Sequence, residues 1–382
     1  MTGSPDVIVV GLGGMGAAAT YHLARRGLAV LGLEQFGPAH DRGSSHGGSR
    51  VVRQAYFEDP SYVPLARRAY DLWAELEAAW GTPLMQLTGA VMVGSDASEV
   101  VAGTRRSAEE WGLAHEVLSA DEVGRRVPTL APGADAVAVW EPAGGFVRPE
   151  EAVRAHLGLA ERHGARLAFG ETVTGWRSDR SGVRVDTTAG RHDAGRLVVC
   201  PGAWAPWLLG GLNINLVVER QVQYWLSPER GIEAFLPDRH PVFFWEDEAG
   251  GQLYGFPAHE GPRGGVKVAF YHGGAACTPG SVDRTVHQHE VDALTAFLRP
   301  RIPALGGTLL RTAVCMYTNT PDRHFVVGPH PGAPRVTVAC GFSGHGFKFV
   351  PVIGEVIADL VIEEATPHPL AAFDPGRALP PP

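Results

Sequence analysis

The beginning of the chain combines short apolar runs with a glycine-rich turn. An apolar run at Asp6–Val10 is followed directly by GLGGMG, then by an alanine-rich helical pattern at Ala17–Arg26 and a second apolar run at Leu28–Glu34. Short apolar runs of this length are typical of buried strands, and Gly27 marks the end of the helix. The pattern predicts a strand–helix–strand unit whose second strand ends in an acidic residue.

Three further segments have helical patterns. Tyr62–Trp80 reads as an amphipathic helix. Ser119 and Glu122 have the spacing of a capping box, so a helix is expected to start there. Phe146–Gly164 contains a helix whose first turn accommodates Pro149.

The middle and the end of the chain differ in character. Residues 217–319 read mostly as strands with one helix, whereas Arg335–Ile362 reads as a strand, a glycine loop and a helix. The chain therefore starts and finishes with elements of a nucleotide-binding fold, and a β-rich segment lies between them. We expect an α/β (α+β) protein with a Rossmann-like domain and a second domain rich in β-sheet.

Composition narrows the function classes. The 382 residues are 45% hydrophobic and 19% charged, with a formal net charge of −8, so neither nucleic acid nor an anionic membrane is an expected partner. No apolar run reaches the ~18 residues of a membrane span. The first residues lack the basic region of a signal peptide, and a cytoplasmic location is the default expectation. None of the four cysteines forms a CxxC pair, so we expect no metal site.

The glycine turn carries the first chemical signal. Gly11, Gly13 and Gly16 have the spacing that allows a tight turn, close approach of a pyrophosphate and close packing of a helix on a strand. The pyrophosphate would then lie at the helix N-terminus. Glu34 stands about where a ribose-binding carboxylate belongs. These residues predict dinucleotide binding, but their spacing leaves the choice between NAD and FAD open.

Two lysines form the second signal. The chain has 33 lysines and arginines, of which only Lys267 and Lys348 are lysines. A GC-rich coding sequence could leave two lysines by drift. Alternatively, both positions require a compact ammonium, because arginine is a broad planar fork that cannot replace a small cation beside a reacting centre.

Several motifs together resemble one enzyme family. GSSHGGSRVVRQAY, YGFP, GGVKVAF, AVCMYTNTPD and GFSGHGFKF occur in this order over essentially the whole chain. The chain is thereby similar to monomeric sarcosine oxidase and N-methyltryptophan oxidase, which are FAD-dependent oxidases of N-methyl amino acids. The resemblance implies a discontinuous FAD-binding domain at about 1–84, 146–216 and 320–382, and a substrate domain at about 85–145 and 217–319.

The resemblance also implies how FAD is held. It implies a covalent bond between the flavin 8α carbon and the sulfur of Cys315, with His46 and Arg50 against the flavin. For His46 alone, a loop histidine bonded to backbone is the alternative. The cofactor-binding residues expected in this way are Gly11, Gly13, Gly14, Met15, Gly16, Glu34, Gln35, Ser44, His46, Arg50, Val173, Gly202, Trp204, Cys315, Gly344, His345, Gly346 and Lys348.

Both lysines coincide with active-site positions of the family. The resemblance implies that Lys348 and Arg53 bind the substrate carboxylate, and that Lys267 activates dioxygen as a fixed ammonium beside the flavin. Tyr254 and Tyr317 match residues that line the family's substrate pocket. Their alternative is a core position with a satisfied hydroxyl.

The chain departs from the family at the pocket. The family has a histidine four residues after its oxygen-activating lysine, where this chain has Tyr271 with His272 next to it. Trp245 stands where the family has a less bulky residue. Both substitutions leave the substrate open, and they favour a larger or cyclic secondary amino acid over sarcosine.

The expected function is oxidation of a secondary amino acid to an imine, with dioxygen as acceptor and hydrogen peroxide as product. The expected partners are a small amino acid and O₂, and the expected state is a monomer. Two rivals stay open: an oxidase of a cyclic imino acid or unusual amino acid in a biosynthetic pathway, and a flavin subunit that passes electrons to a protein partner. Lys267 argues against the second rival.

Overall fold

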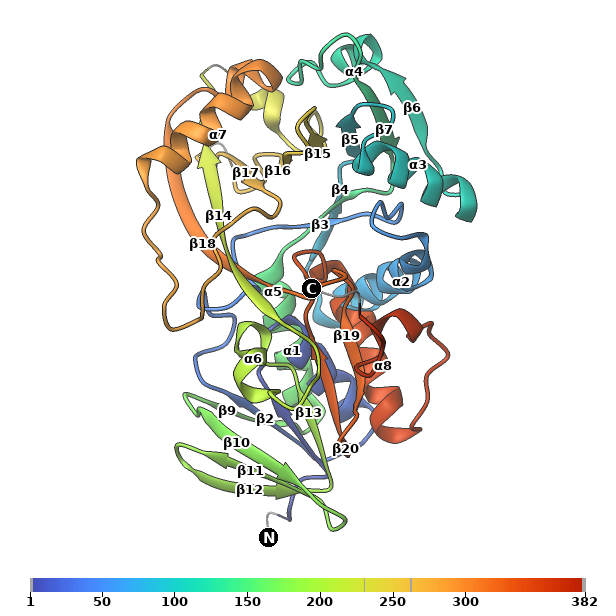
Figure 1. Ribbon diagram of the computed structural model, residues 1–382, viewed down its shortest axis with the longest axis vertical. Helices are drawn as coiled ribbons and strands as arrows, with labels where there is room; N and C mark the ends of the chain where they lie inside the picture. The colour runs from blue at the N-terminus through green and yellow to red at the C-terminus, as the bar shows by residue number, and fades with distance from the viewer. Residues whose placement is uncertain (1–2, 230, 262, 380–382) are drawn as a thin grey trace.

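The computed structural model describes residues 3–229, 231–261 and 263–379. The outermost ends of the predicted segments 1–84 and 320–382 lie outside these ranges. The described chain forms several sheets with helices packed against them, which confirms the expected α/β class. Figure 1 shows one large sheet in the lower half of the molecule, near the N-terminus, and another in the upper half.

The lower half is built on a six-stranded sheet. Four neighbouring pairs of its strands are parallel and only the edge pair β19–β20 is antiparallel. Its strands come from the beginning, the middle and the end of the chain, in the order β19 (Val326–His330), β20 (Ala333–Cys340), β13 (Arg196–Val199), β1 (Val7–Val10), β2 (Val30–Glu34) and β9 (Arg166–Phe169). A small antiparallel sheet lies beside it, formed by β10 (Val173–Ser178), β11 (Val183–Thr187) and β12 (Gly190–Ala194).

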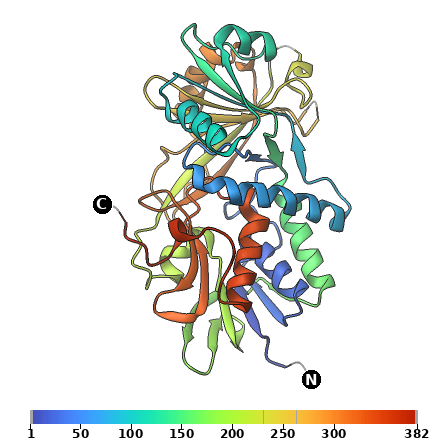
Figure 2. The same ribbon diagram turned by 90° about the vertical axis from the view of Figure 1, so that its right-hand side faces the viewer.

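Three helices cover one face of the six-stranded sheet and share an apolar core with it. Helix α1 (Gly14–Arg25) packs between α5 (Pro149–Arg162) and α8 (Val350–Ile362). Their buried alanine, valine and isoleucine side chains contact those that point from β1 toward the helices. Helix α2 (Val63–Trp80) packs on α5 and α8 as well, and Figure 2 shows it lying across the middle of the molecule.

The upper half is built on an eight-stranded sheet. Its strands in order are β18 (Leu309–Asn319), β14 (Val217–Leu226), β17 (Val266–Phe270), β16 (Gln252–Phe256), β15 (Val242–Glu246), β5 (Ala90–Gly94), β7 (Val137–Glu141) and β6 (Glu116–Ser119). The helices of this half are α3 (Glu99–Trp111), α4 (Ala120–Arg126) and α7 (Gln288–Arg301).

The two halves are connected by more than covalent links. The long strands β14 and β18 run from the upper half down to the lower one (Figure 1). A small sheet of β3 (Arg50–Val52), β8 (Gly145–Val147) and β4 (Met85–Leu87) lies where the halves meet. The short helix α6 (Ala205–Leu208) follows β13 in the lower half. The domain boundaries expected from the sequence stay a prediction.

Local sequence signals explain most element boundaries. The capping box at Ser119 and Glu122 is present at the start of α4, as predicted. Pro149 is the first residue of α5, as expected for a residue without an amide hydrogen. Helix α1 begins at Gly14, earlier than the alanine pattern suggested, because Gly13 already occupies the extended N-cap position. The glycine turn is therefore part of the helix start.

Among the described residues, none of the helices combines the length and the apolar character that crossing a bilayer requires. The helices instead present their apolar faces to the two sheets.

The glycine turn generates a stability prediction. A Cβ at Gly16 would lie 1.7 Å from the Gly11 carbonyl oxygen, so Gly16→Ala must push α1 away from β1. Overpacking of this kind typically destabilises by ~1–3 kcal/mol, and we expect a thermal midpoint several degrees lower. Gly124→Ala is the control, because that glycine lies within α4 with open space around its Cβ position. Equal thermal midpoints for both variants would contradict the packing argument.

Candidate functional site

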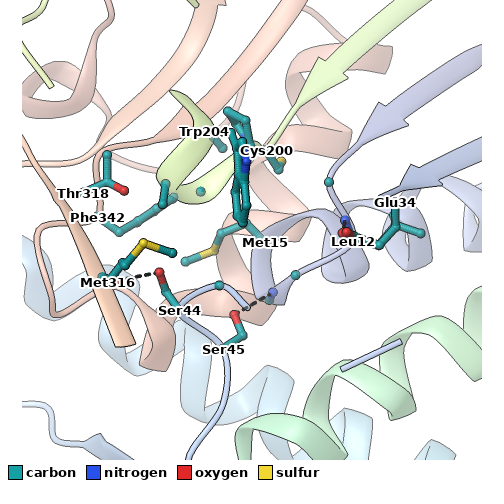
Figure 3. A pocket seen from close by; sticks show the side chains of 18 of the residues that line it. Leu12, Met15, Glu34, Ser44, Ser45, Cys200, Trp204, Met316, Thr318 and Phe342 are labelled. Carbon is teal, nitrogen blue, oxygen red and sulfur yellow. Dashed lines mark hydrogen bonds between the residues drawn. The ribbon is translucent and has the colours of Figure 1, made fainter. Parts of the chain in front are cut away.

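The glycine turn shapes one end of a long cavity. Gly11 has φ +83°, and a Cβ there would meet the Cys200 carbonyl oxygen at 2.4 Å. The amide of Gly14 donates to Ser45 Oγ at 3.1 Å, and the first turn of α1 faces the cavity (Figure 3). A helix N-terminus that faces a cavity is suited to an anionic group.

Glu34 fixes this turn from the end of β2. Its carboxylate accepts hydrogen bonds from the Leu12 amide at 2.9 Å and the Phe36 amide at 3.0 Å. Burial alone would raise the pKa of Glu34, but hydrogen bonds from His40 and these amides hold it below its usual value. The carboxylate is thus ionised and lines the cavity, where it can accept from a hydroxyl group.

The long cavity has an empty volume, including its open mouth, of about 1360 Å³. It runs between α1, the turn that follows β13 and the loop before α8, and Figure 3 shows side chains from all three around it. The expected cofactor residues that line it are Gly11, Gly13, Gly14, Met15, Glu34, Gln35, Ser44, Arg50, Val173, Gly202, Trp204, Gly344 and Gly346. Sequence reasoning missed Ser45, Thr172, Trp207 and Phe342, although Ser45 and Phe342 lie within two of the quoted motifs.

Four expected cofactor residues lie elsewhere. Gly16 is packed behind the turn, against Gly11. His345 and Lys348 line a second cavity instead. His46 is buried, and its Nε2 has no hydrogen-bond partner among the described residues. Burial and the nearby charge of Arg50 lower the pKa of His46 to about 4, so its ring is neutral.

Cys315 lies beside a cation at the edge of the long cavity. Its Sγ is 3.8 Å from Arg50 Nη2 and 3.7 Å from the Ser44 carbonyl oxygen. The next residues along β18, Met316 and Tyr317, line the cavity. The sulfur of Cys315 is thus in direct contact with the guanidinium of Arg50.

Among the described residues, neither of the other two buried cysteines, Cys200 and Cys340, has a guanidinium within hydrogen-bonding distance of its sulfur. Burial raises the pKa of the Cys200 thiol far above its usual value and raises that of Cys340 to about 12. All four cysteines are free thiols. The two thiols are thus placed differently: Cys200 lines the long cavity, whereas Cys315 lies behind two lining residues, Arg50 and Ser44.

A second cavity continues from the first. Its empty volume is about 480 Å³, and Arg50, Tyr317, Gly344 and Phe347 line both cavities. The remaining residues around it are Val51, Arg53, Glu58, Phe244, Tyr254, Tyr271, His345 and Lys348. One side of this space is therefore aromatic and the other is charged.

The charged side carries two cations and one carboxylate. Arg53 Nη2 donates to Glu58 Oε2 at 2.5 Å. Burial opposes ionisation of Glu58, but Arg53, His345 and Lys348 together hold its pKa at about 2. Burial and the charge of Arg53 lower the pKa of Lys348 to about 7, although Glu58 acts in the opposite direction.

The ammonium of Lys348 is held by the loop that precedes α8. Its Nζ donates to the His345 carbonyl oxygen at 2.7 Å and to the Tyr56 hydroxyl at 3.4 Å. One N–H remains for a ligand in the cavity. Arg53 and Lys348 thus place a guanidinium and an ammonium group in one small cavity. This combination is suited to binding a carboxylate.

Lys267 does not line either cavity in the described part of the chain. Its Nζ donates to the carbonyl oxygens of Gly47 at 2.7 Å and Ser49 at 2.9 Å, and it lies over the ring of Phe256 at 4.8 Å. Burial and the charge of Arg50 hold its pKa well below the usual value. The Lys267 ammonium therefore lies behind the residues that line the cavities and contacts residues 47–50.

Trp245 does not lie where the sequence analysis expected it. Trp245 packs on the far face of the eight-stranded sheet with Leu253 and other apolar side chains. Its neighbour Phe244 lines the second cavity instead. Successive side chains of a strand point to opposite faces, so the expected pocket role of Trp245 is wrong and Phe244 takes that place.

Tyr254, Tyr271 and Tyr317 line the cavity as expected. The Tyr254 and Tyr317 hydroxyls are 3.3 Å apart, and the Tyr271 hydroxyl donates to Glu58 Oε1 at 3.3 Å. His272 turns away, with φ +65° and Nδ1 3.5 Å from a Glu219 carboxylate oxygen. Of the two residues that could correspond to the histidine of the family, Tyr271 lines the cavity and His272 does not.

Glu58 and Phe244 are site residues that sequence reasoning missed. Glu58 lies five residues after Arg53 on the same loop, so a search for a carboxylate near the expected anchor could have found it. Phe244 carried no signal, because the sequence does not say which face of β15 meets the cavity.

Three comparisons with known proteins agree with this geometry. Residues 6–360 match the model of the DAO family, described as FAD dependent oxidoreductase. A monomeric sarcosine oxidase of Streptomyces avermitilis is 56% identical over 99% of this chain and 98% of its own length. An N-methyl-L-tryptophan oxidase of Salmonella dublin is 34% identical over 97% of this chain and 98% of its own length.

Solved structures give the same result. NikD, an unusual amino acid oxidase essential for nikkomycin biosynthesis, superposes in its open form with a TM-score of 0.85 at 25% identity, covering 99% of both chains. The Rossmann-type turn, the long cavity and whole-length similarity to curated sarcosine oxidases thus lead to one assignment. The chain belongs to the DAO family of FAD-dependent oxidoreductases, in the part of it that contains the monomeric sarcosine oxidases and the N-methyl-L-tryptophan oxidases.

Proposed function

We propose that this enzyme oxidises the secondary amine of an amino acid, with dioxygen as electron acceptor, and forms hydrogen peroxide. The observation that carries this proposal is the pair of buried cations, Arg53 and Lys348, in a cavity that continues into the cofactor cavity. A carboxylate bound there would hold the neighbouring amine at the junction of the two cavities, beside Tyr317 and Gly344.

The residues of the long cavity fit FAD. The close-packed glycine turn and the cavity-facing N-terminus of α1 suit its pyrophosphate, and the ionised Glu34 suits a ribose hydroxyl. When bound, FAD takes two electrons from the amine and returns them to the acceptor. The protein holds the reactants in place, excludes water and sets the charges around them.

A covalent bond from Cys315 to the flavin is part of the proposal. Support comes from the position of Cys315 Sγ beside Arg50, which lines the cavity, whereas burial raises the pKa of Cys200, the cysteine that lines it. The guanidinium of Arg50 also donates to the Ser44 carbonyl oxygen, so its position is defined independently of the thiol.

Lys267 is proposed to serve dioxygen. Its ammonium is fixed by two carbonyl oxygens and has one N–H left, which is suited to holding a water or a small polar molecule. A preorganised positive charge in a buried site stabilises negative charge that develops as dioxygen is reduced. This role separates the oxidase from a flavin subunit that passes electrons to a protein.

The aromatic wall supports a second candidate within the same chemistry. Phe244, Tyr254, Tyr271 and Tyr317 line the same cavity as the carboxylate anchor, and Phe244 and Tyr254 are stacked with their centroids 6.0 Å apart. A ring or a large apolar group would gain more from this wall than a lone methyl group. An oxidase of a cyclic or aromatic secondary amino acid is therefore the alternative to a sarcosine oxidase. A monomeric, cytoplasmic enzyme remains part of the proposal in either case.

The covalent bond is tested by acid precipitation. Wild-type protein should keep its yellow colour in the pellet, whereas Cys315→Ser should release the flavin into the supernatant. Cys200→Ser is the control, because Cys200 lines the cavity but has no cation within hydrogen-bonding distance among the described residues. Free flavin released from the wild type would refute the bond.

The two lysines should act on different half-reactions. Lys267→Met should slow aerobic reoxidation by ~10²–10³, the typical effect of losing one preorganised charge, and change anaerobic reduction far less. Lys348→Met should mainly raise the substrate KM. Stopped-flow measurement of both half-reactions checks this, and equal effects of both variants on both steps would exclude the division of roles.

Substrate preference should depend on Phe244 and not on Trp245. We expect kcat/KM to be higher for proline, pipecolate or an N-methyl aromatic amino acid than for sarcosine, by ~10-fold or more if the wall contacts an added ring. Phe244→Leu should reduce this ratio, whereas Trp245→Phe, on the other face of the same strand, should preserve it. Sarcosine as the best substrate of the wild type would show that the aromatic wall does not select larger side chains.

A further inference from the structure

The Arg53 side chain is held entirely by its own loop. Its Nη1 donates to the Ala55 carbonyl oxygen at 2.8 Å, and its Cζ lies 4.3 Å and 4.2 Å from the ring centroids of Tyr56 and Phe57. Glu58 completes this arrangement with its ion pair to Nη2. The position of the guanidinium therefore depends on the backbone conformation of residues 53–58.

This loop has no regular secondary structure that would fix its backbone. It follows β3 and precedes the short helix at Pro60, and the amides of Gln54 and Ala55 have no strand or helix partner. Buried amides without an acceptor are costly, so both need one. They find it in the side chain of Glu141, whose Oε1 accepts from Gln54 at 2.6 Å and whose Oε2 accepts from Ala55 at 3.3 Å.

Glu141 comes from the other half of the molecule. It is the last residue of β7 in the eight-stranded sheet and is only 1% exposed. No cation forms an ion pair with it in the described ranges, and the charges facing it are those of Arg53 and Lys348. A buried carboxylate without an ion pair is rare, and its two backbone hydrogen bonds account for its presence.

We propose that Glu141 is a positioning residue that holds the Arg53 loop in the conformation in which Arg53 binds the substrate carboxylate. This inference rests on the proposed carboxylate anchor and goes beyond it. Glutamine cannot replace the carboxylate, because one of its two terminal atoms is a donor and would face a backbone N–H. The requirement is thus for two acceptor oxygens, side by side and supplied by the opposite domain.

The titration behaviour of the site supports the same view. Burial raises the pKa of Glu141 to about 7, although the amides of Gln54 and Ala55 and the charge of Arg53 act against it. A carboxylic acid offers one strong acceptor oxygen where the carboxylate offers two. Ligand binding should therefore weaken as the pH falls through 7 and Glu141 is protonated.

On the alkaline side of the pH profile, binding should weaken because of Lys348. Its pKa is about 7, so its charge is lost as the pH rises. The other titratable groups that face this pair do not titrate near neutrality. Glu58 stays ionised, His345 stays neutral with a pKa of about 3, and the pKa values of Tyr56 and Tyr70 are well above 10. Binding of a carboxylate should thus be strongest near pH 7.

The experiment uses the FAD-loaded enzyme and benzoate, a carboxylate without an amine, with binding followed by the change in flavin absorption. Glu141→Gln should raise the benzoate Kd by about tenfold, raise KM, leave kcat within about threefold and remove the acid limb of the pH profile. Without the negative charge of Glu141, the alkaline limb should also move to lower pH.

Glu77→Gln is the control. The carboxylate of Glu77 also accepts from two consecutive amides, those of Leu84 and Met85, but both bonds go to one oxygen, Oε1, which a glutamine retains. Glu77 belongs to α2 and lines neither cavity in the described chain. It should leave Kd and the pH profile unchanged. Glu141→Gln is also made in an Arg53→Lys background, where its effect on Kd should fall below about twofold, because a residue that acts through Arg53 is coupled to it.

The outcomes separate the two hypotheses. If Arg53→Lys and Lys348→Met leave benzoate binding unchanged, the carboxylate anchor itself is refuted. If they weaken binding but Glu141→Gln behaves like Glu77→Gln, or has an effect that is additive with Arg53→Lys, the positioning role is overturned. Should Glu141→Gln give no folded holoenzyme, the wild-type profile decides: a Kd that is constant from about pH 5.5 to 7 would overturn the role of Glu141.

Discussion

The site depends on oxygen atoms that compensate the charges of three buried cations. These cations lie where the two large sheets meet. Arg53, Lys267 and Lys348 are each at most 6% exposed. A buried charge without partners is strongly destabilising, so each of the three must find oxygen atoms in the protein. Most of these oxygens belong to one segment, residues 47–58, which supplies three backbone carbonyls and the carboxylate of Glu58.

The same segment is held by side chains from distant parts of the chain. Glu150, in the first turn of α5, accepts from the amides of Gly47 and Gly48, while Lys267, on β17, donates to carbonyls of the same stretch. Further along the same segment, Glu141 likewise accepts a hydrogen bond from a backbone amide, that of Gln54. Residues 47–58 are therefore fixed by both halves of the molecule, and the wall shared by the two cavities is fixed with them. Preorganisation of this kind is what allows a few charges to orient a small substrate.

Local signals in the sequence were sufficient for the glycine turn, the first helix and the capped helices. The requirement for glycine at position 16 is local, because a Cβ there would meet Gly11 of the same turn, whereas a Cβ at Gly11 would meet the Cys200 carbonyl at the end of the neighbouring strand β13. The capping box at Ser119 and the proline at the start of α5 depend only on neighbouring residues. The rarity of lysine likewise singled out two positions that the structure buries beside the cavities. The family motifs, rather than periodicity, directed attention to Arg53, Tyr254 and Cys315.

What the sequence determined by itself is the set of local elements and the chemical groups available to the site. Only the tertiary structure decided which of these groups face one another. Strand alternation predicts that Phe244 and Trp245 point to opposite faces, but the choice of the cavity face depends on how β15 packs in the sheet. Glu141 is 86 residues away from Ala55 along the chain, and no local pattern records a contact that exists only because two sheets meet. Long-range packing sets that contact, because a buried carboxylate and two buried amides without partners can satisfy each other only once the two halves have come together.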